Sequence, residues 1–457
     1  MRLFLILIFS LIQTVVCAQQ KLPVIKLTGE FGYDYQGGIV SIIYPDSVSE
    51  DSIEARVKWR GGSTNVEHTH KRNYTIKFGD DRQLFGMRKD NKWILDAGNA
   101  DVFRLRNRIA TELWNDMCQK TYYADREPNA LSGVRGRVVE VYLNEEYMGI
   151  YSLTECMDRK QLKLKKYDKD TGEIRGGLWK AITWENTMMW DYQPYDNRSE
   201  TWGGFEVKYP ELGDVDETDY STLYNAISFV VNSSDADFIS HIAEYFDMPV
   251  VIDYYIFLYV LNAFDNAGKN IFWAVYDKTE NKKLTIGVWD LDGTVGQRWI
   301  NKWVPDSSSP EYPFDDNMNL YYRLRQLNAD SFCEKVFERY QQLRTTCLST
   351  DSLISRYQTY YELLLATGAA QREEQRWSGD EDVNYEVINF QEETAFITDW
   401  ISRHMQYLDE NVFKPTSDIS HPSVSTPRTY FYNLNGHRIN PPQKGINIHN
   451  GRKIVVG

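Results

Sequence analysis

Alternating polar and apolar positions predict strands in the first half of the chain. Residues 57–78, VKWRGGSTNVEHTHKRNYTIKF, have the form of a strand, a turn of small residues and a second strand. In the second strand Lys71, Asn73, Thr75 and Lys77 share one face, because side chains alternate between the two faces of a strand. The turn between the strands can present backbone N–H groups to phosphate oxygens.

A second pair of strands and a helix follow. Residues 138–155, VVEVYLNEEYMGIYSLTE, predict two strands joined by a turn at Asn144–Glu146. Between the two strand pairs, the segment DVFRLRNRIATELW has a helical period that places Leu105, Ile109 and Leu113 on one apolar stripe. The first part of the chain is therefore expected to be rich in strands and to contain one amphipathic helix.

Helical patterns dominate residues 214–413. Two apolar runs interrupt them, IFWAVYD at residues 271–277 and KLTIGVWD at residues 283–290. These runs predict a hairpin around Lys278–Lys282. Each run adjoins a cluster of acidic residues, so we expect the helical part to carry the chemistry.

The first residues predict a secretory signal peptide cut after Ala18. They contain one arginine, an apolar run at residues 3–16 and small residues before Gln19. The run is too short and too poorly flanked to be a lasting membrane anchor, and no later apolar run reaches membrane length. We therefore expect a secreted, periplasmic or cell-surface protein without a transmembrane segment in the mature chain.

The pattern divides the remaining chain into four segments. A β-rich segment at residues 19–210 precedes the helical segment at residues 211–413. Residues 414–427, KPTSDISHPSVSTP, are rich in proline and serine and predict a linker. Short alternating runs separated by Asn-Gly turns predict a small β module at residues 428–457. This module is similar to C-terminal modules of exported Bacteroidota proteins, some of which serve sorting or surface attachment.

Composition supports a packed and acidic protein. The chain has 457 residues, of which 42% are hydrophobic and 14% aromatic, which favours a folded protein over a disordered one. Its formal net charge of −14 argues against nucleic acid and anionic membranes as partners. The sequence leaves open whether the cysteines of the mature chain form disulfides or are buried thiols: Cys118, Cys156, Cys333 and Cys347.

Two acidic clusters predict a site for a divalent metal. Asp265 and Asn270 lie in the word LNAFDNAGKN, and Asp290 and Asp292 follow an apolar strand in the word LTIGVWDLDGTVG. Carboxylate and amide oxygens in this number favour a hard cation such as Mg²⁺ or Mn²⁺. Protein kinases place a catalytic Asp and a metal-binding Asn at the same spacing, with a second metal-binding Asp at a later glycine turn. The usual His-Arg-Asp and Asp-Phe-Gly words are absent, which argues against an ordinary protein kinase.

The word Asp290-Leu-Asp292-Gly-Thr also fits the first motif of haloacid-dehalogenase-type phosphatases. Such a fold needs further parallel strands after the motif, and these would deliver a lysine and a late acidic pair. The following sequence is helical and polar, and its Gly379-Asp380 word has no apolar strand before it. We therefore treat the phosphatase as the weaker alternative.

Six short sequence motifs, in this order along the chain, resemble those of a known family. They are Arg-Gly-Gly-Ser-Thr, Lys-Arg-Asn-Tyr-Thr-Ile-Lys-Phe, Leu-Arg-Asn-Arg-Ile-Ala, Val-Tyr-Leu-Asn-Glu-Glu-Tyr-Met-Gly-Ile-Tyr, Val-Lys-Tyr-Pro and Trp-Asp-Leu-Asp-Gly. Together they resemble the spore coat protein H (CotH) family of secreted atypical kinases, over residues 22–413. The resemblance implies an α+β, two-lobed atypical protein-kinase-like fold, with a β-rich N-lobe, a mainly helical C-lobe and the small C-terminal β module.

The resemblance also implies roles for individual residues. Asp265 would be the catalytic base, and the metal would be held by Asn270, Asp290 and Asp292. ATP would be bound by the following residues: Arg60, Gly61, Gly62, Ser63, Lys71 (with Lys77 in reserve), Glu155 and Lys208. Of these, Lys71 is the first residue of the Lys-x-x-Tyr motif, and Glu155 would orient that lysine or bind metal.

The expected activity is transfer of the γ-phosphoryl group of ATP, with Mg²⁺ or Mn²⁺, to a hydroxyl group of an exported protein. By the resemblance the acceptor would be Ser or Thr, and a glycan hydroxyl is an open alternative. The contrasting function is a surface adhesin or pseudokinase that keeps the fold without catalysis. Retention of all four polar residues of the two acidic clusters favours the enzyme, because a binding protein gains nothing from uncompensated acids in one cleft.

Overall fold

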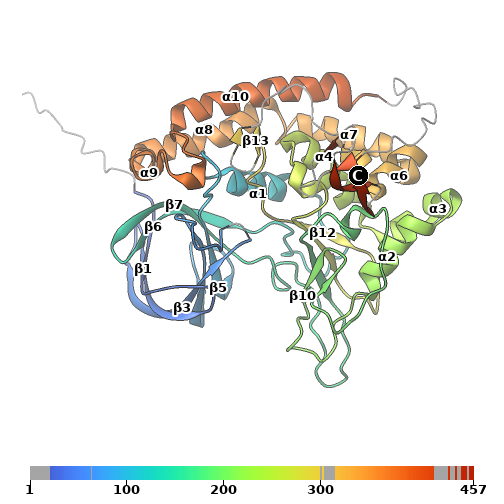
Figure 1. Cartoon of the computed structure of the whole chain (residues 1–457), viewed down its shortest axis with the longest axis horizontal. Helices are drawn as coiled ribbons and strands as arrows, with labels where there is room; N and C mark the ends of the chain where they lie inside the picture. The colour runs from blue at the N-terminus through green and yellow to red at the C-terminus, as the bar shows by residue number, and fades with distance from the viewer. Residues whose placement is uncertain are drawn as a thin grey trace, which may run out of the picture.

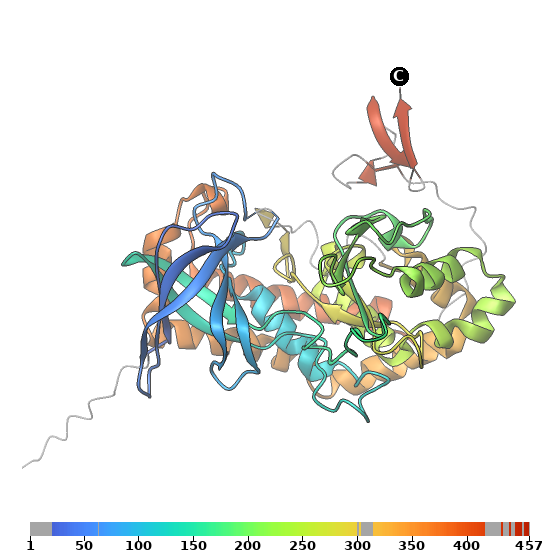
Figure 2. The same cartoon turned by 90° about the horizontal axis from the view of Figure 1, so that it is seen from below.

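The structure is a computed structural model that describes residues 21–62, 64–298, 301–302 and 314–415, and in the tail residues 431–432, 438–439, 444–449 and 452–456. The chain is α+β, as expected. A β-barrel lies beside a larger part in which helices pack on a second sheet (Figure 1). Seen from below, the barrel and the second sheet lie side by side (Figure 2).

Seven strands close the barrel in the order β1-β2-β3-β4-β5-β7-β6. All neighbours are antiparallel except β1 and β6. The strands are β1 Val24–Thr28, β2 Gln36–Ile43, β3 Glu50–Arg60, β4 Asn73–Gln83, β5 Lys89–Asp96, β6 Gly136–Leu143 and β7 Glu146–Thr154. The predicted strand pair at residues 138–155 is confirmed, and Asn144 and Glu145 form its turn with positive φ angles.

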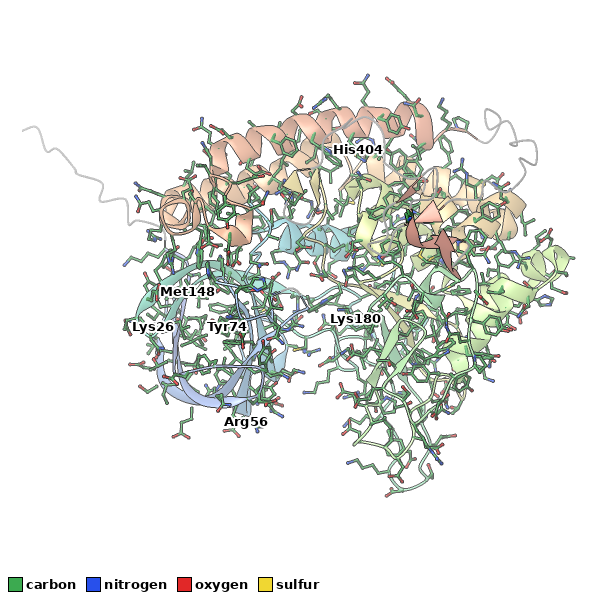
Figure 3. All side chains as sticks on the ribbon, in the orientation of Figure 1. Lys26, Arg56, Tyr74, Met148, Lys180 and His404 are labelled. Carbon is green, nitrogen blue, oxygen red and sulfur yellow. The ribbon has the colours of Figure 1, made fainter. Side chains whose placement is uncertain are left out.

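Apolar side chains at alternate positions fill the barrel. Val57, Ile76 and Trp93 are cross-strand neighbours on β3, β4 and β5, and all three are buried. Tyr74 also points into the barrel (Figure 3). Because β4 begins at Asn73, the predicted face of the second strand loses its first member, Lys71, which lies in the preceding loop.

The second sheet has five strands in the order β12-β11-β8-β10-β9. Its strands are β8 Gly177–Ala181, β9 Thr201–Trp202, β10 Phe205–Tyr209, β11 Ile271–Val275 and β12 Thr285–Val288. The predicted hairpin of β11 and β12 is confirmed, and β8 pairs with β11, so the sheet unites strands from both sides of residue 210. Every pairing is antiparallel, which contradicts the parallel sheet that a haloacid-dehalogenase-type phosphatase requires.

Among the described residues there are ten α-helices, nine of which follow β10. They are α1 Arg106–Met117, α2 Ser221–Asn232, α3 Asp235–Tyr245, α4 Met248–Leu261, α5 Phe314–Asn317, α6 Asn319–Leu327, α7 Phe332–Arg344, α8 Thr350–Ala366, α9 Ala369–Trp377 and α10 Phe390–Tyr407. Single turns are η1 Asn186–Met188, η2 Phe264–Ala267, η3 Ala329–Ser331, η4 Glu381–Val383 and the π-helical η5 Leu408–Val412. Figure 1 shows α8 and α10 running along one side of the molecule, and α9 lying over β7 of the barrel.

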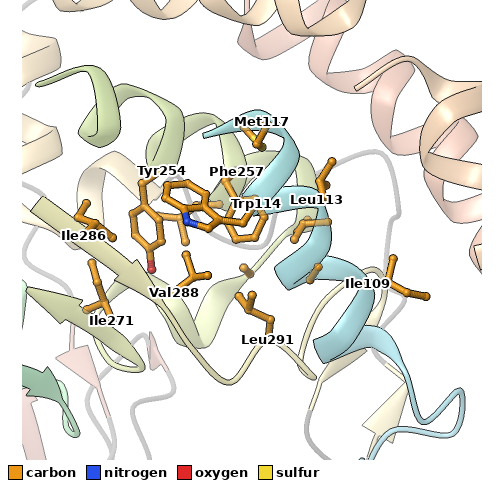
Figure 4. Close-up of a cluster of buried hydrophobic side chains, with 14 of the residues drawn as sticks. Ile109, Leu113, Trp114, Met117, Tyr254, Phe257, Ile271, Ile286, Val288 and Leu291 are labelled. Carbon is orange, nitrogen blue, oxygen red and sulfur yellow. The ribbon is translucent and has the colours of Figure 1, made fainter. Parts of the chain in front are cut away.

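The core of the larger part forms where α1 and α4 pack on β11 and β12 (Figure 4). Ile109 and Leu113 face this core from α1, which confirms the predicted apolar stripe. Trp114 meets Tyr254 and Phe257 of α4 edge to face, with ring centroids 5.7 and 5.2 Å apart. This core supports the segment that follows β12, where the predicted metal ligands lie.

The smaller elements lie outside these two parts. A short hairpin pairs β13 Gln297–Arg298 with β14 Asn301–Lys302, and the tail forms a four-stranded sheet from β15 Phe431–Tyr432, β16 Arg438–Ile439, β17 Gly445–His449 and β18 Arg452–Val456. The predicted signal peptide and most of the predicted linker lie outside the described residues. Among the described residues the structure has no disulfide, and the four cysteines discussed above are thiols.

Candidate active site

The two acidic clusters meet at one place. Asp265 lies on η2, directly after α4, and its neighbour Asn266 is buried. The Asn266 Nδ2 donates to the carbonyl oxygen of Trp289 at 2.8 Å and to that of Asp290 at 3.4 Å. Tyr254 of α4 holds the other side of Asn266, since its hydroxyl donates to the Asn266 carbonyl at 2.6 Å. One amide side chain therefore joins the segment that carries Asp265 to the segment that carries Asp290 and Asp292.

Asp265 is oriented by two neighbours in its own loop. Its Oδ2 accepts from Asn270 Nδ2 at 2.8 Å and lies 3.1 Å from Lys269 Nζ. Asn270 adopts a left-handed conformation with φ of 56° and donates its backbone N–H to Ala181 of β8. The structure thus brings the predicted base and the predicted amide ligand into direct contact, and it adds a lysine that the sequence analysis did not single out.

The segment after β12 is anchored by Leu291, the residue between the two acids. Leu291 is fully buried under α1 (Figure 4). Its backbone N–H donates to Asn107 Oδ1 at 3.0 Å, and its carbonyl accepts from Thr294 Oγ1 at 2.8 Å. Leu291 is buried, whereas Asp290, which has a φ of 59°, is exposed and Asp292 is half-buried.

Arg106, at the start of α1, holds the next residues of this segment. Its guanidinium donates to the carbonyl oxygens of Thr294 at 3.1 Å and Val295 at 3.4 Å. The buried charge is balanced by Asp101 at 2.6 Å and Glu393 of α10 at 2.5 Å. Val295 has a φ of 50°, which is a strained conformation for a β-branched residue, so Arg106 holds the backbone where it would otherwise relax.

The carboxylates of this site lie close to one another, and their proximity affects the pKa of Asp292. Burial raises the pKa of Asp292 well above its usual range, and the nearby carboxylates of Asp290, Asp96, Asp101 and Asp265 raise it further. Burial likewise raises the pKa of Asp96, which accepts from Asn107 Nδ2 at 2.7 Å. Oxygen donors crowded in this way suit a hard divalent cation. Across the described ranges, no three His, Cys, Asp or Glu side chains are placed so that they could hold a metal ion together.

Two basic side chains lie near this cluster. The guanidinium of Arg60, at the end of β3, stacks on Trp289 at 5.1 Å from the ring centroid. Lys180 of β8 lies between the barrel and the second sheet (Figure 3). Burial lowers the pKa of Lys180, while the nearby Asp290 raises it. In the described part of the chain neither Arg60 nor Lys180 has an ion pair, whereas Lys208 pairs with Glu206 of its own strand.

The predicted phosphate turn is tightly built at its first glycine. Gly61 has a φ of 107°, and a Cβ at this position would lie 2.0 Å from Thr64 Oγ1. That hydroxyl donates to the Arg60 carbonyl at 2.8 Å and accepts from Asn73 Nδ2 at 3.1 Å. Gly62 has open space around it, and Ser63 lies outside the described residues.

Lys71 lies inside the molecule and pairs with Glu373. Its side chain is fully buried, with Nζ 3.0 Å from Glu373 Oε1 on α9 and 2.6 Å from the carbonyl oxygen of Ile150. Burial lowers the pKa of Lys71 to about 7, and Glu373 opposes that shift. The acidic partner of Lys71 is thus Glu373, which the sequence analysis did not identify.

Glu155 and Lys77 also have definite places. The buried carboxylate of Glu155 accepts from Arg135 at 2.7 Å, from the backbone N–H of Arg88 at 2.7 Å and from Gln161 at 3.2 Å. Lys77 points outward from β4, between Arg56 and Lys92 on the neighbouring strands. Neither side chain is in contact with Lys71.

Several residues that build the site were missed by the sequence analysis. Arg106 and Asn107 belong to the Leu-Arg-Asn-Arg motif, which is part of the family resemblance, yet no role was assigned to them. Asn266 and Lys269 lie between the two residues that were selected. All four residues lie inside or beside a sequence motif described above, and this position is what could have identified them.

A family model described as CotH kinase protein matches residues 57–408. The chain belongs to the CotH kinase family. The match begins in β3 and ends in η5, so it contains both acidic segments and most of the barrel and excludes the tail. No curated protein matches the sequence. Within the residues that the structure describes, no helix is long and apolar enough to cross a membrane.

Proposed function

We propose that this CotH kinase family protein transfers the γ-phosphoryl group of ATP to a hydroxyl group of an acceptor. The observation that carries the proposal is the contact of Asn266 with the carbonyl oxygens of Trp289 and Asp290. This contact joins a loop with the Asp and Asn of a kinase catalytic loop to a second segment with two further carboxylates. We also propose that the barrel and the helical part correspond to the two lobes of a kinase, with ATP between them.

In this proposal Asp265 accepts the proton of the acceptor hydroxyl. Its carboxylate is held by Asn270 and Lys269, and the lysine limits the negative charge near the incoming hydroxyl. Mg²⁺ or Mn²⁺, held by Asn270, Asp290 and Asp292, would supply charge neutralisation on the phosphate oxygens. The raised pKa of Asp292 supports this assignment, because a bound cation would offset both the burial and the repulsion from neighbouring carboxylates that raise it.

The phosphate groups would meet Arg60 and Lys180. Both cations lie close to Asp290, and in the described part of the chain neither is neutralised by an ion pair. The turn at Gly61 lies next to Arg60 and can add backbone N–H groups. Lys71 would act indirectly in this scheme, because its ammonium group is sealed inside the protein by Glu373.

The acceptor is proposed to be Ser or Thr of an exported protein. This rests on the predicted signal peptide and on family membership. A glycan hydroxyl remains the alternative acceptor, and both can be offered in one assay.

The test is phosphate transfer from γ-labelled ATP by the protein from Gln19 onward, with Mg²⁺ or Mn²⁺, to itself and to added acceptors. The informative variants are Asp265→Asn and Asp292→Asn, because each removes one charge with little change in shape. Asp125→Asn is the matched control, since Asp125 is exposed and has no role in the site. We expect transfer by the wild type and the control, and a loss of about 10²-fold or more in both site variants. No transfer by the wild type, together with no ATP-induced thermal shift, would favour the adhesin or pseudokinase function.

A further inference from the structure

Three basic side chains form a row across the outer face of the barrel. Arg56 of β3 pairs in register with Lys77 of β4, and Lys77 pairs with Lys92 of β5. The adjacent positions on these strands face the barrel core, so the three cations point outward. We call these three residues the basic row. Figure 3 shows Arg56 at the end of the barrel that lies away from α9.

The basic row is not balanced by acids. In the described part of the chain, none of its three side chains makes a hydrogen bond or an ion pair. The nearest aromatic group is Tyr35, whose ring lies 5.5 Å from the Arg56 guanidinium and 4.9 Å from Lys58 Nζ. Glu54 lies on the same face, two residues before Arg56 on β3, and forms no ion pair in the described structure. Unpaired cations are unexpected here because the chain as a whole carries a net charge of −14.

Like charges at directly opposed positions of a sheet destabilise it. The fold therefore gains nothing from Arg56 beside Lys77 or from Lys77 beside Lys92. An anion bound across the three strands would turn this repulsion into attraction. Such an arrangement indicates a binding surface rather than a structural one.

The basic row is set back along the strands from the end of the barrel that meets the acids. Arg60 marks the end of β3 that touches Trp289, and Asp96 marks the end of β5 that neighbours Asp290. Arg56 and Lys92 each lie four residues earlier on the same strands, which corresponds to about 13 Å. The row lies on the same outer face as Arg60 and Asp96, the residues that mark the end of the barrel nearest the acids.

We propose that the basic row binds an acidic segment of the polypeptide acceptor and so selects acceptors that are rich in Asp, Glu or phosphorylated residues. This inference rests on the proposed kinase function, since it names the acceptor of that site. Arg56 and Lys92 would hold the two sides of the acidic segment, and Lys77 its centre. Tyr35 would supply an apolar wall beside Arg56.

Direct binding tests the proposal without requiring transfer. The probe is a fluorescent oligo-glutamate peptide, compared with oligo-glutamine, and the readout is fluorescence anisotropy at low ionic strength. The double variant Arg56→Gln/Lys92→Gln leaves Lys77 and the site around Asp290 intact. Its control, Lys120→Gln/Lys282→Gln, removes the same charge from exposed lysines elsewhere. We expect the Kd for oligo-glutamate to rise about fivefold to tenfold in the first variant and to stay unchanged in the control.

A kinetic experiment shows whether the basic row binds the acceptor or the nucleotide. Two serine peptides differ only in flanking glutamates or glutamines. The Arg56→Gln/Lys92→Gln variant is expected to raise KM for the glutamate peptide and to leave the Kd of ATP and transfer to the glutamine peptide unchanged. An equal loss of ATP affinity would assign the row to the nucleotide and overturn the proposal. Wild-type protein that binds both probes equally would also overturn it. Absence of transfer to either peptide contradicts the kinase function alone, because the binding experiment still decides the role of the row.

Discussion

Lys71 and Glu373 form a buried ion pair that joins the barrel to the helical part. The Nζ to Oε1 distance is 3.0 Å, and both side chains are fully buried. Glu373 has two more partners, since Oε1 accepts from Arg104 Nε at 2.7 Å and Oε2 accepts from the backbone N–H of Ile150 at 2.7 Å. One carboxylate on α9 therefore fixes the loop before β4, the strand β7 and the segment before α1.

The two members of this pair are expected to differ in their effect on stability. Glu373→Gln leaves the cations Lys71 and Arg104 close together without their shared anion, so it should lower the free energy of unfolding by about 3–5 kcal/mol. Lys71→Met removes one of two cations and leaves the pair of Arg104 with Glu373, so its cost should be smaller. Urea unfolding of both variants measures the difference.

A contrary result would be a Lys71→Met protein that is as stable as the wild type but no longer binds ATP. Lys71 would then contact the nucleotide, which its burial in this structure does not allow. The Glu362→Gln variant is the control for a charge change on a helix surface, because Glu362 is an exposed residue of α8.

Local patterns predicted most elements but misplaced Lys71. Alternation assigned it to the face of Asn73, Thr75 and Lys77, yet alternation holds only within a strand and β4 begins at Asn73. The partner Glu373 lies in the polar helix AAQREEQRW, where nothing in the sequence distinguishes it from its neighbours. Contacts between distant segments depend on the packing of whole elements, which a local pattern does not contain.

The acidic residues were predictable because spacing and turn chemistry are local properties. Asp265, Asn270, Asp290 and Asp292 were identified in this way, and the structure places both clusters at one point. The residues that hold them there were not identified, because an asparagine such as Asn266 in a polar loop has the composition of an ordinary turn. Its role depends on the carbonyl groups it meets after folding.

Asn266 offers a test of positioning as opposed to chemistry. Asn266→Ala removes the hydrogen bonds to the carbonyls of Trp289 and Asp290, and leaves those partly buried carbonyls without this donor. We expect a stability loss of about 1–3 kcal/mol and a fall in kcat of about 10²-fold, since the acids lose their mutual geometry. The measurement is kcat and KM for ATP on the same preparation. A rise in KM with unchanged kcat would mean that Asn266 affects nucleotide binding and not the placement of the acids.

The two glycines of the phosphate turn form a matched pair. In Gly61→Ala the new methyl group would meet Thr64 Oγ1 at 2.0 Å, and the φ of 107° is strained for alanine. The expected loss of stability is about 1–3 kcal/mol, with weaker ATP binding because the turn must shift. In Gly62→Ala the methyl group meets open space, so both quantities should stay near wild type. Equal effects of the two substitutions would contradict the tight geometry at Gly61.

The lowered pKa of Glu155 predicts that this residue contributes to stability in a pH-dependent way. Burial alone would raise the pKa of this carboxyl, but hydrogen bonds from the Arg135 side chain and from the backbone N–H groups of Arg88 and Arg135 outweigh it and lower the pKa below 4.5. A depressed pKa means that the unfolded chain binds more protons in this range than the folded protein. The stabilisation is therefore fully present above pH 4.5 and is lost as the pH falls through the folded pKa.

We expect Glu155→Gln to reduce the free energy of unfolding by about 2–3 kcal/mol at pH 7, because charged hydrogen bonds are replaced by neutral ones. The difference between wild type and variant should shrink as the pH is lowered below 4.5, since the wild-type carboxyl then becomes protonated as well. Urea unfolding at a series of pH values measures it, and Glu362→Gln again serves as the control. A variant with wild-type stability at pH 7 but no phosphate transfer would assign Glu155 to the nucleotide or the metal, as the family resemblance first implied. The contacts of Glu155 with Arg135, Arg88 and Gln161 favour the structural role, because they already occupy both carboxylate oxygens.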